Sequence, residues 1–230
     1  MNAPLARTLR CAACGAPVEF QSPFCAYCRV PLTWGASLDV EPGRSLWTVD
    51  LRREPLPSEA TFGADVTVTP EGRMLTLDGS VTFRGLMTTP PLRDACASVV
   101  ATCWEPNLGF GVTGRTHTEG HAQSAYTLMV NPTARVYRVD RRLWTKTETH
   151  IEVMRNWEVT SSLAGLGAPN RVELRYADAV FQIVINGAHV ASLVDARFGF
   201  GRVGWRAVSF DDLPQRKRIV LHAMEARAVA

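Results

Sequence analysis

The sequence of 230 residues lacks long hydrophobic runs and has little excess of charge of either sign. No apolar stretch reaches the roughly 20 residues that a membrane-spanning helix needs, so we expect no membrane insertion. A formal net charge of +3 is too small to favour a nucleic-acid ligand. Residues 1–10 also lack the apolar core of a secretory signal peptide. Together these absences favour a cytoplasmic protein with reduced thiols.

Helical periodicity is missing as well. From residue 46 onward, short strand-like runs alternate with turn residues, at a spacing of roughly 8–12 residues that is typical of β-sandwiches and barrels. The predicted strands cover 46–51, 66–69, 74–77, 81–83, 97–104, 108–112, 125–130, 135–139, 149–154 and 218–226, with further strands in 170–209. One turn of helix over 159–166 is an alternative. The pattern predicts one large all-β domain, with room for a small N-terminal module.

Residues 170–209 show the clearest strand pairing. The segment 170–176 alternates between apolar and polar residues, which is typical of a half-buried strand. Asn186-Gly187 predicts a two-residue hairpin turn, because both central positions of a type I′ turn need a positive φ. Ala177-Asp178 is a second candidate turn. The expected pairs are Ile185 with Ala188, Ile183 with Val190 and Phe181 with Ser192 across the first turn, and Leu174 with Phe181 and Val172 with Ile183 across the second. Both registers place Val172, Leu174, Phe181, Ile183, Ile185 and Val190 on one apolar face.

Cysteine is scarce, but four of the six cysteines form two Cys-x-x-Cys pairs. The metal ligands predicted from this spacing are Cys11, Cys14, Cys25 and Cys28. Two such pairs can surround one ion with four sulfurs at about 2.3 Å, a geometry typical of zinc, with iron the lesser alternative. Two disulfides in an exported protein are the competing interpretation. A closed four-cysteine site is expected to be structural, since no coordination position stays open, and the metal would supply folding free energy to a very small module.

The segment from Cys11 to about Leu32 resembles the zinc-ribbon family, in which Cys-x-x-Cys-Gly and Phe-Cys-x-x-Cys cap two short hairpins. Arg29 departs from that pattern, because the family usually has a glycine there, where φ is positive. We therefore expect a zinc ribbon over 1–34, a linker over 35–45 that contains proline and glycine, and a β-sandwich over 46–230.

The sandwich segment carries three motifs in order: Asn-Arg-Val-Glu-Leu at 170–174, an apolar strand ending in Asn186-Gly187, and Gly-Arg-Val-Gly-Trp at 201–205. This order resembles the concanavalin A-like lectin and glucanase superfamily. The resemblance implies a two-sheet antiparallel jelly-roll sandwich, whose concave face binds glycans in many members. The expected fold class is thus all-β, with a small four-cysteine zinc ribbon and a jelly roll.

Catalytic signatures are lacking. No glutamate is followed two positions later by aspartate, so the Glu-x-Asp-x-x-Glu strand motif of the related glucanases is missing. Neither a P-loop nor a Gly-x-Ser-x-Gly elbow is present. Gly-x-Gly-x-x-Gly matches at 109–114 and 199–204 run into strand patterns, which favours glycines of a curved sheet over a dinucleotide site.

Other candidate residues have ordinary structural explanations. A cluster of His117, Glu119 and His121 lies close in sequence, but a metal or catalytic site there would need further ligands. His189 is expected on a solvated sheet face. Cys96 and Cys103 fall on opposite faces of one strand and are expected to be small buried residues. Core packing is the commoner role of tryptophan, and short basic clusters usually form solvated edges. The tryptophans are Trp104, Trp144, Trp157 and Trp205. The basic clusters are Arg135, Arg138, Arg141 and Arg142, and Arg216, Lys217 and Arg218.

Two classes of function fit these observations. The first is a non-catalytic binding or scaffold protein, with a protein or a glycan as ligand. The second is a glycan-processing hydrolase of the glucanase type with a non-standard active site, assembled from loops such as 104–107 or 116–121. The closed metal site, the missing acidic motif and a cytoplasmic location favour the first, and we predict no catalytic or cofactor-binding residues beyond the metal ligands.

Overall fold

The computed structural model describes residues 14–17, 25–29, 42–55, 64–78, 82–87, 89–119, 122–210 and 216–229. These residues form fourteen β-strands. The strands are β1 (Pro42–Asp50), β2 (Ala64–Thr69), β3 (Gly72–Asp78), β4 (Thr82–Leu86), β5 (Ala95–Cys103), β6 (Leu108–Glu119), β7 (Ala122–Asn131), β8 (Val136–Trp144), β9 (Thr149–Val159), β10 (Asn170–Ala177), β11 (Val180–Ile185), β12 (Ala188–Val194), β13 (Arg202–Ser209) and β14 (Arg216–Val229). Among these residues, no helix is long and apolar enough to cross a membrane.

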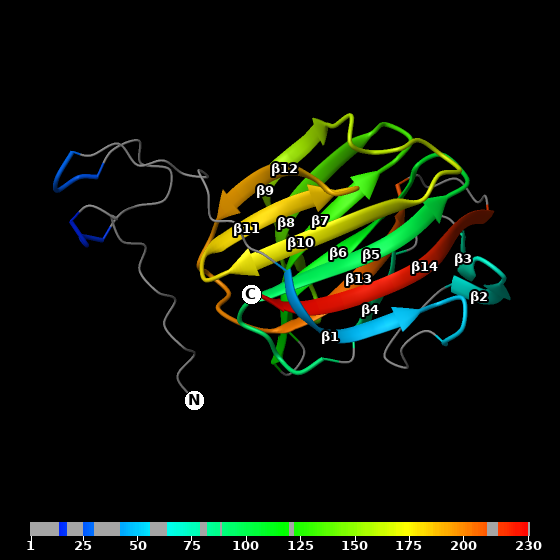
Figure 1. The fold of residues 1–230 in the computed structure, drawn as a ribbon, viewed down its shortest axis with the longest axis horizontal. Coiled ribbons are helices and arrows are strands. Elements are labelled where there is room, and N and C mark those ends of the chain that lie inside the picture. The colour runs from blue at the N-terminus through cyan, green and yellow to red at the C-terminus, as the bar shows by residue number, and fades with distance from the viewer. Residues whose placement is uncertain are drawn as a thin grey trace.

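The strands form two stacked sheets (Figure 1). One sheet has eight strands in the order β12-β11-β10-β5-β14-β3-β2, and β1 also pairs with β14. The other has six strands in the order β4-β13-β6-β7-β8-β9. All pairings are antiparallel, which confirms the expected two-sheet antiparallel sandwich. The first strand begins at Pro42, inside the stretch expected to be a linker, and 161–168 form turns and bends in place of the alternative helical turn.

The core lies between the inner faces of the two sheets, as period-two alternation requires. Side chains such as Phe110, Trp205 and Ile183 are fully buried there. Gly85 on β4 leaves room for the indole of Trp205, since a Cβ at that position would lie 2.6 Å from Nε1. The predicted apolar face of 170–190 is buried apart from Val190, which is partly buried against the same core.

The two hairpins of β10, β11 and β12 confirm one predicted turn and correct the other. Asn186 and Gly187 have φ values of 51° and 84°, and Ile185 lies opposite Ala188 as expected. The pairs further along that hairpin differ from those expected, because a bulge after Ile183 advances the partner strand and places Ala191 opposite Ile183.

The second turn contains Asp178 and Ala179, one residue later than predicted. Ala177 pairs with Val180, so each β10 residue faces a β11 partner two positions further along than expected. Asp178 adopts a φ of 48°, which aspartate tolerates better than most residues. A shift of two leaves the same side chains in the core, and the faces were therefore predicted correctly although the partners were wrong.

A buried arginine connects several loops to the end of β6. Arg115 has a φ of 50° at a break in the β6–β7 register, and its side chain is 1% exposed. Its guanidinium donates to the carbonyl oxygens of Arg93 at 3.0 and 3.1 Å, Phe198 at 2.9 Å, and Asp178. The Tyr176 and Phe181 rings each lie 5.1 Å from its central carbon. Burial lowers the pKa of Arg115 from its usual value, and the carbonyls and rings replace the solvation that this cation loses.

Candidate functional site

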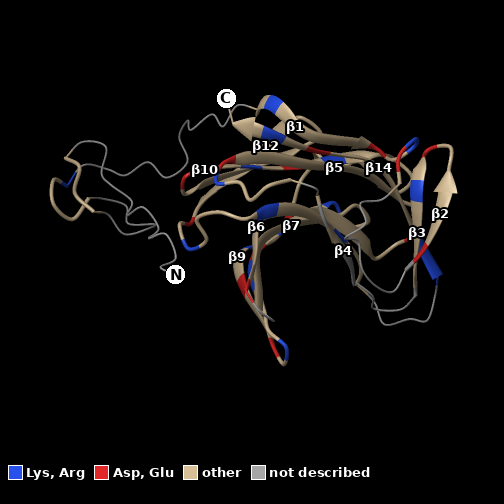
Figure 2. Cartoon of the chain, turned by 90° about the horizontal axis from the view of Figure 1, so that it is seen from below, with Lys and Arg blue, Asp and Glu red and all other residues tan. Residues whose placement is uncertain are grey.

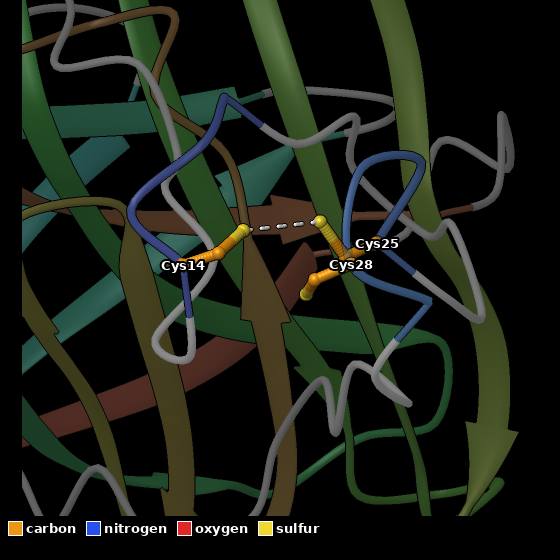
Figure 3. Close-up of side chains that lie close together, drawn as sticks. All are labelled: Cys14, Cys25 and Cys28. Carbon is orange, nitrogen blue, oxygen red and sulfur yellow. Dashed lines mark hydrogen bonds between the residues drawn. The ribbon is translucent and has the colours of Figure 1, made fainter.

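Three of the four predicted metal ligands lie together. The sulfur atoms of Cys14, Cys25 and Cys28 are all within 4.8 Å of one another, and Sγ of Cys14 lies 3.7 Å from Sγ of Cys25 (Figure 3). The fourth predicted ligand, Cys11, lies outside the described residues. Across the part of the chain that the structure describes, this is the one group of three or more metal-ligating side chains.

The spacing of these sulfurs fits a metal ion. Four sulfurs at about 2.3 Å in a tetrahedron would lie roughly 3.8 Å apart. Gly15 and Arg29, which follow the second cysteine of each pair, have φ values of 70° and 60°. Arg29 therefore adopts the conformation that usually needs glycine, and its N–H donates to the Cys25 carbonyl at 2.9 Å. The pKa of Cys25 is lowered to about 7, chiefly because the Cys28 backbone N–H donates to its sulfur. The cluster is thus able to hold a metal ion.

The second candidate site is the outer face of the six-stranded sheet. Its edge strand β9 bends away from the eight-stranded sheet, so that this outer face lies on the inside of the curve (Figure 2). In the observed register, Arg206 on β13 shares a row with Gly111, Met129 and Arg138 on the next three strands. Alternation along β8 places Arg138, Asp140 and Arg142 on this same face. We call it the curved face.

Asp140 lies on the curved face between two arginines of the same strand. Its side chain is fully buried, and Nε of Arg138 donates to Oδ1 at 2.6 Å while Nη2 of Arg142 donates to Oδ2 at 2.5 Å. The side chains of Arg138 and Arg142 are 22% and 15% exposed. A buried carboxylate between two arginines holds both guanidinium groups in defined positions.

Aromatic side chains flank these arginines. The central guanidinium carbon of Arg206 lies 5.6 Å from the Trp144 ring centroid, and that of Arg138 lies 5.9 Å from the Trp157 centroid. Phe210 meets Trp157 edge-on, with a centroid distance of 5.4 Å and an interplanar angle of 89°. Trp144 and Trp157 are partly exposed, so the curved face combines flat apolar surfaces with cations.

The acidic content of the curved face limits its chemistry. Glycoside hydrolysis uses two carboxyl groups about 5–10 Å apart, one of which carries or receives a proton. Within the described residues of β6, β7, β8 and β13, the register places one carboxylate on this face, Asp140, and both its oxygens accept from arginines. This pair of bonds suits a structural role for Asp140.

The remaining predicted candidates are dispersed. His117 is exposed and packs edge-on against Phe200, whereas His121 lies outside the described residues. His189 is exposed and lies opposite Val184, where its Nε2 contacts Ser192 Oγ at 2.9 Å. Cys96 and Cys103 are both buried, as predicted, and desolvation raises the pKa of Cys103. Neither glycine-rich match precedes a helix, because 109–114 lies within β6 and 199–204 runs into β13.

The arginine-rich segment 135–142 differs from its predicted role as a solvated edge. Arg138 and Arg142 clamp Asp140 on the curved face, while Arg141 on the opposite face of β8 pairs with Asp195 and Glu152. The tryptophans also differ in exposure: Trp205 is in the core, whereas Trp104 is 49% exposed. The alternating Arg-x-Asp-x-Arg of 138–142 was the available sequence signal for the curved face.

Comparison with solved structures identifies the fold. A Bacillus subtilis protein with a galectin-like fold is 12% identical, with a TM-score of 0.59 over 83% of this chain and 98% of that one. The carbohydrate-binding module CBM66 of B. subtilis is 13% identical, with a TM-score of 0.56 over 72% and 92%. A Bacillus licheniformis β-glucanase is 8% identical, with a TM-score of 0.53 over 81% and 99%. No protein-family model and no curated protein sequence matches the chain. At these identities, the likeness shows that the sandwich has the concanavalin A-like, galectin-like fold.

Proposed function

We propose that the protein is a non-catalytic glycan-binding protein. Its β-sandwich binds a saccharide on the curved face, and its N-terminal cysteines form a structural zinc ribbon. The observation that carries this proposal is the presence of two partly exposed tryptophans beside fixed arginines, on a face where the described carboxylate is buried and engaged. Aromatic rings can stack on the apolar faces of sugars, and fixed polar groups supply orientation.

The similar structures support a saccharide ligand over a protein ligand. One of them is described as a carbohydrate-binding module and another as a β-glucanase. The β-glucanase makes hydrolysis the second candidate, in which the catalytic acid and base come from loops. The lack of a carboxylate pair on the described strands of the curved face favours binding without hydrolysis.

Replacing Trp144 or Trp157 by alanine tests the binding face. If a ring stacks on the ligand, its loss is expected to weaken binding by about tenfold, since an aromatic contact contributes roughly 0.5–1.5 kcal/mol beyond area burial. A glycan array would identify a bound saccharide, and calorimetry would give its affinity for each variant. Trp104→Ala, which removes a more exposed tryptophan ring from the loop after β5, is the control. Turnover of a bound glycan by the purified protein would contradict the non-catalytic assignment.

Metal analysis tests the zinc ribbon. We expect close to one equivalent of zinc per chain in purified protein, measured by inductively coupled plasma mass spectrometry. Cys25→Ser should abolish most of this binding and unfold the ribbon, because a lost thiolate opens the tetrahedral site. The sandwich, whose core begins at Val49, should keep its melting temperature. Cys96→Ala removes a buried thiol from β5 and should retain the metal. Less than half an equivalent in the wild type would refute the site. A cytoplasmic location, where thiols stay reduced, belongs to the same proposal.

A further inference from the structure

The curved face is positively charged as well as aromatic. Arg138, Arg142 and Arg206 contribute three positive charges, and Asp140 contributes one negative charge. Both oxygens of Asp140 already accept from arginines, so this carboxylate offers little to the hydroxyl groups of a neutral sugar. The part of the face around Asp140 is therefore rich in hydrogen-bond donors and poor in acceptors, which favours a ligand with the opposite character.

Donor capacity remains after the internal pairing is complete. A guanidinium has five N–H donors, and Arg138 and Arg142 each give one to Asp140. Nε of Arg142 is buried and finds no hydrogen-bond partner within the described part of the chain. The same is true of the Thr127 hydroxyl, on the residue opposite Asp140 in β7, which is fully buried. Both of these atoms are buried, so the donors open to a ligand are the remaining N–H groups of Arg138 and Arg142, whose side chains are 22% and 15% exposed.

Two of the arginines converge on one point of the face. Arg138 and Arg142 lie four residues apart on β8, but their guanidinium groups meet at Asp140, because they donate to its two carboxylate oxygens. Arg206 lies three strands away in the row of Arg138. Asp140 holds the Arg138 and Arg142 guanidinium groups in place, so little conformational freedom is lost when they bind an anion. Two guanidinium groups held this close together suit a negatively charged ligand group that accepts from both.

We propose that the ligand of the curved face is an anionic saccharide, with carboxylate or sulfate groups that accept from Arg138 and Arg142. This inference rests on the proposed glycan-binding function and adds the chemical class of the ligand. Asp140 acts as a positioning residue for the two arginines, and Trp144 and Trp157 contact the sugar rings beside the charged groups.

The test compares charged and neutral forms of the same polymers by calorimetry or affinity electrophoresis. Polygalacturonate is set against its fully methyl-esterified form for carboxylates, and dextran sulfate against dextran for sulfates. We expect at least one charged form to bind tenfold or more tightly than its neutral counterpart, and its affinity to fall as sodium chloride is raised from 50 to 300 mM. Arg142→Gln should weaken that binding about tenfold, whereas Arg142→Lys should retain part of it.

Arg53→Gln is the matched control, because it removes the same charge from a residue that is 87% exposed and follows β1 of the other sheet. It should leave binding unchanged. Equal binding of charged and neutral forms, or equal losses in Arg142→Gln and Arg53→Gln, would overturn the inference while the glycan-binding function stands. Binding of no saccharide at all would overturn both. Should Arg142→Gln fail to fold, Arg138→Gln and the wild-type comparison of charged and neutral polymers decide the question.

Discussion

Replacing Ile183 by aspartate is expected to lower the free energy of unfolding by about 4 kcal/mol or more. Ile183 lies on β11 between Leu174 of β10 and Ala191 of β12, and its side chain is fully buried. A carboxylate there would be surrounded by apolar groups and would have to be buried charged or take up a proton at a cost. Urea denaturation followed by tryptophan fluorescence measures the effect, provided that the slope of the transition is the same in both proteins.

A matched substitution on an exposed strand separates burial from the chemistry of aspartate. Val68 on β2 is 69% exposed, so Val68→Asp should change the free energy of unfolding by less than about 1 kcal/mol. An Ile183→Asp variant with the denaturation midpoint of the wild type would mean that this side chain does not face the core.

Arg115→Met is expected to destabilise the protein by about 3 kcal/mol or more. The methionine has a similar length, but it leaves the carbonyl oxygens of Arg93, Asp178 and Phe198 without their donor. A carbonyl oxygen that loses its donor and is not reached by water costs about 1–3 kcal/mol. Arg115→Lys should recover only part of the loss, because a single ammonium group cannot reach three carbonyls with the planar geometry of a guanidinium.

Thermal and urea denaturation measure the stability of each variant relative to the wild type. Arg53→Met, at an exposed position, should stay within about 0.5 kcal/mol of the wild type. A stability loss at position 115 no larger than that at position 53 would show that the carbonyls find other partners, and would assign the buried guanidinium no structural role.

The sequence was sufficient to predict those features that depend on local alternation or local turn chemistry. Period-two patterns gave the buried faces of β10 and β11, and Asn186-Gly187 gave its hairpin turn. The neighbouring turn was placed one residue too early, because a register shift of two keeps every apolar side chain inside and leaves the pattern unchanged. The choice between these two registers depends on contacts between residues that are distant in sequence. The Asp178 N–H donates to the Asp94 carboxylate at 2.7 Å, and Arg93 pairs with Asp178.

Features that depend on several distant segments were not predictable in this way. The partners of Arg115 come from three separated loops, so nothing in its neighbourhood distinguishes it from a surface arginine. The curved face was predictable only in part. Its Arg-x-Asp-x-Arg alternation is visible in the sequence, but the burial of Asp140 between two arginines, on a face built from six strands, is not. The cysteine spacing was the strongest local signal, and three of the four predicted ligands lie together.

The pairing of β1 with β14 has a consequence for how the chain folds. Pro42 lies opposite Val229 and Asp50 opposite Ala223, so the first strand of the sandwich finds its partner only in the last. β1 can therefore join the sheet only after β14 has been synthesised, whereas β5, which pairs with both β14 and β10, can pair with β10 earlier. Contacts so distant in sequence slow folding. The eight-stranded sheet is therefore complete only once β14 has paired, whereas the hairpins of β10, β11 and β12 can form earlier from contacts close in sequence.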